Sequence, residues 1–198
     1  MNQAVLIFAK NLIFGEVKTR LAATAGNDVA FSIYKKLLQY TKEITEKIIA
    51  DKIVFYSNNI EEQDIWNSTI YKKQLQSGNY LGERMQNAFD HAFKNRYEEV
   101  LIIGTDCFEL TSPIIEMAFS QLKHHDIVIG PATDGGYYLL GMKSLYPLLF
   151  ENIEWSTNTV FKKTIAACNQ LSLTYYVLPE LNDVDEEKDL KHVQIITQ

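Results

Sequence analysis

The chain has 198 residues, 46% of them hydrophobic, and a formal net charge of −6 with a pI near 5.3. That length and apolar content suffice for one domain with a full core, and the acidic balance argues against a nucleic-acid binder, which needs a broad basic face. The two cysteines, Cys107 and Cys168, cannot build a disulfide framework, and the apolar N-terminal run is too short for a membrane span, so we expect a cytoplasmic protein.

Apolar runs alternate with longer amphipathic stretches along the chain. The predicted strands span residues 4–8, 52–57, 100–104, 126–130, 137–142 and 174–178. The predicted helices span residues 28–50, 81–95, 113–123, 157–169 and 186–197. Ser112 followed by Pro113 marks a helix start, because serine can cap and proline lacks only an N–H that has no helical partner there. Unbroken apolar runs such as VLIIG and DIVIG are typical of strands buried on both faces of a mainly parallel sheet.

No repeat, low-complexity tract or linker divides the chain, so we expect residues 1–198 to form one Rossmann-like α/β domain. Ligands of such sheets bind beyond the carboxyl ends of the strands. Charged residues follow four of the predicted strands: Lys10, Lys18 and Arg20 the first, Asp106 the third, Asp134 the fourth, and Asp183 and Asp185 the last. We therefore expect them to surround one crevice, although loops are polar in any protein.

The segment from Lys10 to Arg20 is cationic within an acidic protein. A Walker A loop needs a glycine directly before Lys-Thr, where Val17 stands, so a P-loop ATPase is disfavoured. Gly15 permits a sharp turn, and in an extended loop Lys18 and Arg20 would face the same way. Such a pocket suits a small phosphorylated ligand; the alternative is a solvated loop or ion pairs with nearby acids. As a surface-loop residue, Lys18 should contribute little to folding.

Carboxylates supply the complementary charge. Asp106 directly follows a strand, where it could hold Mg²⁺ or Mn²⁺ together with phosphate oxygens. Asp183 and Asp185 alternate with Val184, so both can face the crevice and supply a second ligand. The alternative is that this acidic run is the solvated start of the last helix.

Six motifs follow one another over almost the whole chain: FAKNLIFGEVKTRLA, YLGERMQNAF, IIGTDCFELTSPII, VIGPATDGGYYLLGM, NIEWSTNTV and LNDVDEEKDL. In this order they resemble a bacterial glycosyltransferase-A-like family long labelled a domain of unknown function, also called radical-SAM/selenodomain-associated transferases. The resemblance implies a three-layer α/β/α nucleotide-diphosphosugar transferase fold. The wider superfamily includes nucleotide-sugar glycosyltransferases and small-molecule nucleotidyltransferases.

The resemblance implies roles for the residues at matching positions. Lys18 and Arg20 match the family's Lys-Thr-Arg and would neutralise nucleotide phosphates. Asp106 matches the acid that holds the divalent ion, and Asp185, with Asp183 beside it, matches the acid or asparagine that supplies a second ligand. These positions agree with the reading of the residues alone.

Three further motifs would contact the nucleotide or the acceptor. Their residues are Gly82, Glu83 and Arg84 on the nucleotide or acceptor side, and Asp134, Gly135, Gly136, Trp155, Ser156 and Thr157 on the acceptor side. Asp134 is a candidate general base if the reaction inverts, or a turn residue that bonds its own backbone. The segment that begins at Trp155 could cap a helix, with the indole as a stacking platform or as part of the core.

The sequence departs from the family pattern at Phe108, where the family usually has proline. Proline would stiffen the turn that aims Asp106. A full DxD metal motif is also absent, because Cys107 and Phe108 follow Asp106. Cys107 has no histidine near it in sequence, so we interpret it as a packed residue rather than a nucleophile.

Three functions remain open from the sequence. The first is a metal-dependent glycosyltransferase that uses a nucleotide-activated sugar donor and a small-molecule acceptor. The second is a nucleotidyltransferase that joins a nucleotide to a phosphorylated small molecule and releases pyrophosphate. The third is a non-catalytic nucleotide-binding module. The family resemblance favours the first, with Mg²⁺ or Mn²⁺ as cofactor.

Overall fold

A computed structural model describes residues 2–191 of the chain. Its centre is a 7-stranded sheet in the order β3-β2-β1-β4-β6-β5-β7. The strands are β1 Gln3–Ala9, β2 Asp51–Tyr56, β3 Tyr71–Leu75, β4 Glu99–Ile103, β5 Ile127–Pro131, β6 Tyr137–Met142 and β7 Tyr175–Val177. The helices are α1 Thr19–Ala25, α2 Asn27–Glu46, α3 Leu81–Lys94, α4 Ser112–Leu122 and α5 Val160–Gln170, with 3₁₀ turns η1 Pro147–Leu149 and η2 Glu187–Asp189.

The sheet is parallel except at one strand, which confirms the predicted α/β class. β1 pairs in parallel with β2 and with β4, and β5 pairs in parallel with β7. β6 runs antiparallel to both β4 and β5. A short connection leads from β5 to β6, and such a connection can join only antiparallel neighbours, because a parallel crossover needs a dozen or so residues.

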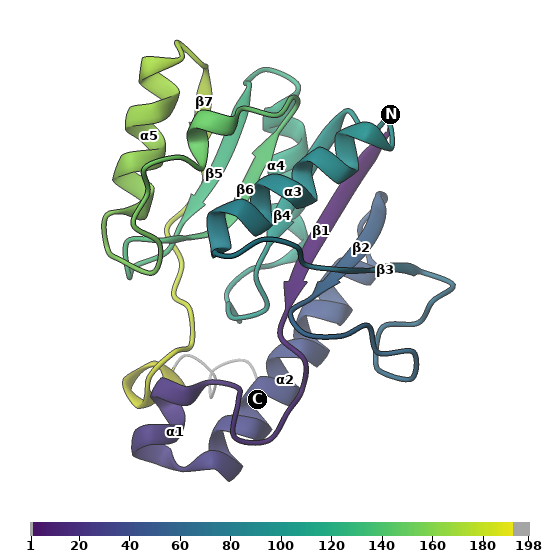
Figure 1. Cartoon of the computed structure of the whole chain (residues 1–198), viewed down its shortest axis with the longest axis vertical. Coiled ribbons are helices and arrows are strands. Elements are labelled where there is room, and N and C mark those ends of the chain that lie inside the picture. Colours follow the sequence, from purple (N-terminus) through teal and green to yellow (C-terminus); the bar gives the residue numbers. More distant parts are fainter. Residues whose placement is uncertain (1, 192–198) are drawn as a thin grey trace.

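Helices cover both faces of the sheet, giving the three layers that the family resemblance implies (Figure 1). Alternate side chains of β1 enter different cores: Val5 and Ile7 pack with residues of α2 and α4, whereas Ala4 and Leu6 pack with residues of α3 and α5. α1 packs on α2 and approaches η2, so the first loop and the C-terminal segment meet at one end of the molecule.

Two elements escape the sequence prediction. β3 has the sequence YKKQL and pairs only with β2 at the edge of the sheet, so it lacks the apolar run that revealed the other strands. α1 is seven residues long and begins at Thr19, inside the segment that we expected to be an extended loop. Helices this short draw most of their stability from tertiary packing, which a sequence pattern does not display.

The ends of several predicted helices also differ from the prediction. α2 ends at Glu46 rather than at residue 50. Helix α4 has Thr111 as its N-cap, and the hydroxyl of Ser112 donates to the carbonyl of Ile44 instead of capping. The predicted last helix is a 3₁₀ turn at Glu187–Asp189 with helical backbone at residues 190–191, and the remainder of the predicted span lies outside the described residues.

Candidate active site

A cavity of about 470 Å³ lies at the carboxyl ends of the strands. From β1 the sheet extends through β2 and β3 in one direction and through β4 in the other. The strand order therefore reverses between β1 and β4. Crevices at such switch points are the usual ligand sites of open α/β sheets. Predicted site residues that line the cavity are Lys10, Arg20, Arg84, Asp106, Asp134, Gly136, Trp155, Ser156, Thr157, Asp183 and Asp185. The predicted residues Gly15, Lys18, Gly82 and Gly135 lie outside this lining.

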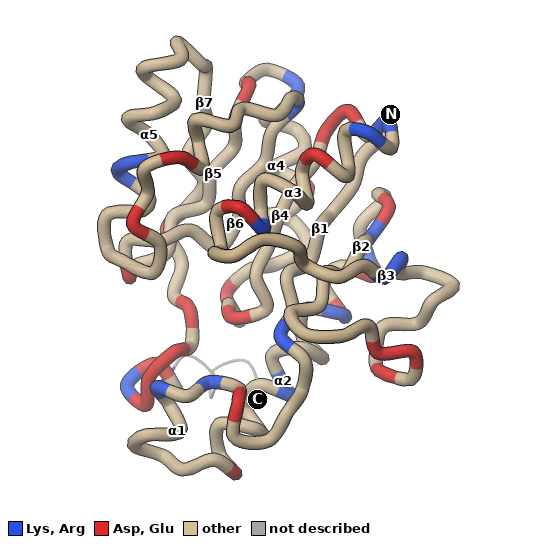
Figure 2. The backbone as a smooth tube through the Cα atoms, viewed as in Figure 1, with Lys and Arg blue, Asp and Glu red and all other residues tan. Residues whose placement is uncertain are grey.

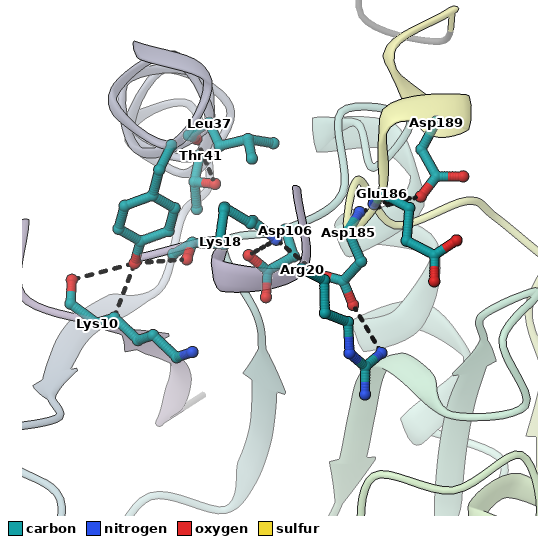
Figure 3. Close-up of polar contacts among 11 residues, drawn as sticks. Lys10, Lys18, Arg20, Leu37, Thr41, Asp106, Asp185, Glu186 and Asp189 are labelled. Carbon is teal, nitrogen blue, oxygen red and sulfur yellow. Dashed lines mark hydrogen bonds and ion pairs between the residues drawn. The ribbon is translucent and has the colours of Figure 1, made fainter. Parts of the chain in front are cut away.

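Lys18 overturns the expectation of a surface loop. Its backbone is left-handed (φ 48°) at the N-cap of α1, and its side chain is only 5% exposed. The ammonium lies 2.5 Å from Oδ1 of Asp106 and 2.9 Å from Oδ1 of Asp185 (Figure 3). Arg20 belongs to α1 and lies 4.0 Å from Asp185, so the two cations do not share one face of an extended strand. Ion pairing with nearby acids, the alternative left open by the sequence, is what the structure contains.

Backbone contacts bring the distant acids together. The amide of Val184 donates to the carbonyl of Asp106 at 2.8 Å, and the side chain of Val184 is fully buried. Asp183 and Asp185, on either side of it, therefore both face the cavity, as their alternation predicts. A carboxylate oxygen of Asp189 accepts from the amides of Asp185 and Glu186, which fixes the turn that follows. Figure 2 shows acidic and basic positions gathering where this segment meets α1.

The two acids of this segment differ in their electrostatics. Burial raises the pKa of Asp183 to about 8, and the neighbouring carboxylates of Asp106, Asp134 and Asp185 add to the rise. Burial alone would also raise the pKa of Asp185, but the Lys18 ammonium outweighs it and holds that pKa below its usual value. Burial opposes the charge of Lys18, yet its two carboxylate partners raise its pKa. The site therefore carries more negative charge than Lys18 alone can balance.

Asp106 and Asp185 supply the type of ligand atom that a divalent cation prefers, but too few of them for a complete site. Asp106 and Asp185 both place an oxygen within hydrogen-bonding distance of one cationic atom, the Lys18 ammonium nitrogen, and hard cations prefer such oxygens. Within residues 2–191, however, no group of three or more His, Cys, Asp or Glu side chains is arranged to hold a metal. A cation here would thus have two protein ligands and would need ligand phosphate and water for the rest of its coordination.

Two polar residues that the sequence did not single out hold the loops around the cavity. The phenol of Tyr34, on α2, accepts from the amide of Lys10, donates to its carbonyl, and lies 3.3 Å from the hydroxyl of Thr105. It thereby joins the loop after β1 to the loop after β4. Asn11, 4% exposed, accepts from the amides of residues 58 and 59, which positions the start of the loop after β2. Tyr34 lies outside the six sequence motifs, and Asn11 lies within the first of them but carries no charge that would mark it as a site residue.

The part of the cavity that follows β1, β2 and β3 is called here the β1–β3 side, and includes Lys10, Ser57, Gln76 and Arg84. The guanidinium of Arg84 comes from α3 but turns toward the end of β3: its Nε donates to the carbonyl of Gly78 at 3.0 Å. The amide nitrogen of Gln76 donates to the carbonyl of Phe55 at 2.9 Å. These contacts fix a cation and a carboxamide on the same side.

The β5–β7 side of the cavity is formed by the β5–β6 turn, the loop before α5 and the segment after β7. The carboxylate of Asp134 accepts from the amide of Gly136 at 2.8 Å, so the turn role that the sequence left open is present. Gly135 has φ +88°, and a Cβ on it would lie 2.3 Å from the carbonyl oxygen of Asn158. Only glycine fits there, because the turn packs directly against the loop before α5.

Trp155 forms a wall of this side rather than a helix cap. α5 begins only at Val160, with Thr159 as its N-cap and no capping side chain, so the predicted cap at residues 155–157 is wrong. The indole meets the ring of Tyr137 edge to face at 6.4 Å. A Cβ on Gly82 would lie 2.3 Å from the indole nitrogen, so the first turn of α3 rests on this ring. The buried indole N–H has no hydrogen-bond partner in the described part of the chain.

The residues after Asp106 belong to the core. Phe108 is 4% exposed and packs on Tyr40 with ring centroids 5.3 Å apart. Cys107 is buried, and burial raises the pKa of its thiol, which agrees with a packed rather than a nucleophilic cysteine. An aromatic contact of Phe108 therefore anchors the turn that carries Asp106.

Residues 40–157, more than half of the chain, match the model of a family described as "Uncharacterized protein conserved in bacteria (DUF2064)". The chain belongs to this family. It is 29% identical over 168 residues to 2-phospho-L-lactate guanylyltransferase of Methanocaldococcus vulcanius, covering 80% of this chain and 71% of that protein. The relatives with named activities are transferases, in agreement with the prediction of an enzyme.

Solved structures confirm the fold. A Desulfovibrio desulfuricans G20 protein, provisionally described as a nucleotide-diphospho-sugar transferase, superposes with a TM-score of 0.85 at 32% identity, covering 94% of this chain and 84% of that one. The 4-diphosphocytidyl-2C-methyl-D-erythritol synthase of Anaerococcus prevotii DSM 20548 gives a TM-score of 0.61 at 11% identity, with 100% and 96% coverage, and so shares the fold alone. Within residues 2–191, no helix has the length and apolar character that a membrane crossing requires.

Proposed function

We propose that this family member is a transferase that uses a nucleotide-activated donor, and that the donor is a nucleotide-sugar. The observation that carries the proposal is the cavity at the β1–β4 switch point, where cations after β1 and on α3 face carboxylates after β4 and β7. Similarity at 32% identity to a protein described as a nucleotide-diphospho-sugar transferase supports the choice of donor.

The proposed roles follow from the charges around the cavity. Lys10, Arg20 and Arg84 would neutralise the donor's diphosphate, since charge-assisted hydrogen bonds to phosphate are among the strongest that a protein makes. Asp106 and Asp185 would hold Mg²⁺ or Mn²⁺, which, when bound, would stabilise the negative charge of the leaving diphosphate. The Lys18 ammonium would then be available for a phosphate oxygen.

Transfer would form a bond from an acceptor oxygen or nitrogen to the anomeric carbon and break the bond from that carbon to the diphosphate. The electron pair leaves with the nucleoside diphosphate, and the acceptor's proton passes to a carboxylate. Asp134 is our candidate for this base, because it lines the cavity on the acceptor side. It would keep its bond from the Gly136 amide through one oxygen and use the other for the proton.

A second function, nucleotidyl transfer, is favoured by the 29% identity to a guanylyltransferase. In that reaction the donor would be a nucleoside triphosphate, and pyrophosphate would leave. In glycosyl transfer the donor is a nucleotide-sugar, and the nucleoside diphosphate leaves. The same cations and carboxylates could serve either reaction, because in each the leaving group is a chain of phosphates whose negative charge must be stabilised.

The deciding experiment is calorimetric binding of a panel of nucleoside diphosphate-sugars and nucleoside triphosphates, with and without Mn²⁺, followed by product analysis. Release of nucleoside diphosphate supports glycosyl transfer, and release of pyrophosphate supports nucleotidyl transfer. Binding without turnover of either kind would support the non-catalytic module. If no nucleotide binds at millimolar concentration, the proposal fails.

A further inference from the structure

The charged side chains of the cavity are divided between its two sides. Lys10 follows β1, Arg20 lies on the helix after β1, and the guanidinium of Arg84 turns to the carbonyl of Gly78 after β3. On the β5–β7 side, Asp134, Asp183 and Asp185 line the cavity, and no lysine, arginine or histidine from that side does so in the described residues.

The remaining cation, Lys18, does not change this division. Its ammonium is held between Asp106 and Asp185, with a side chain only 5% exposed. Arg20, which is exposed, lies 4.0 Å from Asp185, one of the two proposed metal ligands. An anionic group on the β5–β7 side would therefore lie beside the carboxylate of Asp134 without a cation of that side to balance its charge, which is unfavourable.

The uncharged groups of the β5–β7 side suit a different ligand. Trp155 and Tyr137 meet edge to face and form an aromatic wall of the cavity. The hydroxyls of Ser156 and Thr157 come from the loop beside this wall. Aromatic faces next to carboxylates attract hydroxylated molecules and organic cations, the latter through the negative ring faces.

From this division we infer that the acceptor carries a hydroxyl or amine as its reacting group and bears no phosphate or carboxylate. The inference rests on the proposed function and extends it by giving the acceptor a chemical class. It also separates the two candidate reactions, because joining a nucleotide to a phosphorylated acceptor would require cations on the β5–β7 side. Asp134, the candidate base for the acceptor's proton, lines the same side of the cavity.

Choline and phosphocholine test this inference as a matched pair, since they differ only by the phosphate group. Protein labelled with ¹⁵N-tryptophan gives two indole N–H signals, from Trp66 and Trp155. Trp155 lines the cavity, whereas Trp66 lies in the other core outside the lining and serves as internal control. Choline should shift the Trp155 signal saturably at concentrations at least about tenfold lower than phosphocholine, a difference of roughly 1.4 kcal/mol. Inorganic phosphate should leave that signal unmoved.

A pair of serine variants sharpens the test. Ser156 is exposed at the cavity with left-handed backbone (φ 62°), and Ser172 is exposed with the same backbone conformation (φ 55°) away from the cavity. Ser156→Lys would add a cation to the β5–β7 side, so phosphate and phosphocholine should then shift the Trp155 signal. Ser172→Lys adds the same charge and the same backbone strain elsewhere, and should behave as the wild type.

Two results would overturn the inference. The first is that phosphate or phosphocholine moves the wild-type Trp155 signal at the same or lower concentration than choline. The second is that neither choline nor phosphocholine moves it. Nucleotide binding on the β1–β3 side is measured separately by calorimetry, so the two proposals can fail independently. If nucleotides bind while phosphocholine outcompetes choline, only the acceptor class is wrong; if no nucleotide binds, the proposed function itself fails.

Discussion

The two sides of the cavity are built differently. The β1–β3 side follows adjacent parallel strands and presents cations from loops and helix termini. Hydrogen bonds fix the backbone of Lys10 and the guanidinium of Arg84. The β5–β7 side includes the antiparallel strand β6, a tight turn at Asp134 and an aromatic wall. These two sides suit the anionic donor and the uncharged or cationic acceptor that we propose. Lys18 lies at the boundary, between an acid that follows β4 and one that follows β7.

The largest effect is expected from the boundary acids. Asp106→Asn should abolish the strengthening of nucleotide binding by Mn²⁺ and lower turnover by about a thousandfold, because a lost metal interaction costs several kcal/mol. Asp185→Asn should act alike, while Asp28→Asn, at the exposed start of α2, should change neither. Calorimetry with and without Mn²⁺ measures the effect. Equal strengthening by Mn²⁺ in all three variants would show that these acids are not its ligands.

The stability of Asp106→Asn tests the ion pair with Lys18. If Asp106 and Asp185 were unpaired acids, their repulsion would make this substitution stabilise the empty fold. The structure pairs Asp106 with Lys18 at 2.5 Å, so the substitution removes an attraction instead. We therefore expect a lower free energy of unfolding for Asp106→Asn in urea titrations without ligand.

The acceptor side is tested by Asp134→Asn. The new side-chain oxygen can still accept from the Gly136 amide, so folding should not change, but the base is lost. General bases contribute about a hundredfold or more, and turnover should fall by at least that factor with nucleotide affinity unaltered. Initial rates and calorimetry on the same sample separate the two quantities. Undiminished turnover would leave Asp134 with its turn role alone.

Lys18→Met tests the boundary between the sides. Removing a buried ammonium that contacts two carboxylates should lower the free energy of unfolding by about 2–3 kcal/mol. Mn²⁺ without nucleotide should bind the variant more tightly than the wild type, because the competing cation is gone. Lys35→Met, at an exposed position of α2, is the matched control. An unfolding midpoint equal to that of the control would contradict the structural role of Lys18.

The smallest effect is expected where the two sides touch. Gly82→Ala would place its Cβ 2.3 Å from the Trp155 indole nitrogen, and we expect a loss of about 1–3 kcal/mol of unfolding free energy from overpacking. In a Trp155→Leu background the same change should be neutral or stabilising by up to roughly 1 kcal/mol, since alanine favours a helix over glycine. Urea titrations of the four proteins give the coupling. Additive effects would show that Gly82 and Trp155 do not constrain each other.

Much of the fold could be predicted because its signals are local. Unbroken apolar runs revealed β1, β2, β4 and β5, and the strand-end rule correctly placed Asp106, Asp134 and Asp185 at one cavity. β3 was missed because an edge strand needs no apolar run, and α1 because so short a helix draws its stability from packing on α2.

The types of residue at the site could be predicted from the sequence, but the contacts that each residue makes could not. The sequence by itself placed the acids that follow strands, Asp106, Asp134 and Asp185, at the crevice, since strand direction and loop position settle that. Only the tertiary structure decided that Lys18 is buried between two acids, that Tyr34 joins two loops, and that the Arg84 guanidinium turns toward β3. The physical reason is that each of these contacts joins segments brought together by the folded sheet, and no local pattern encodes which segments will meet.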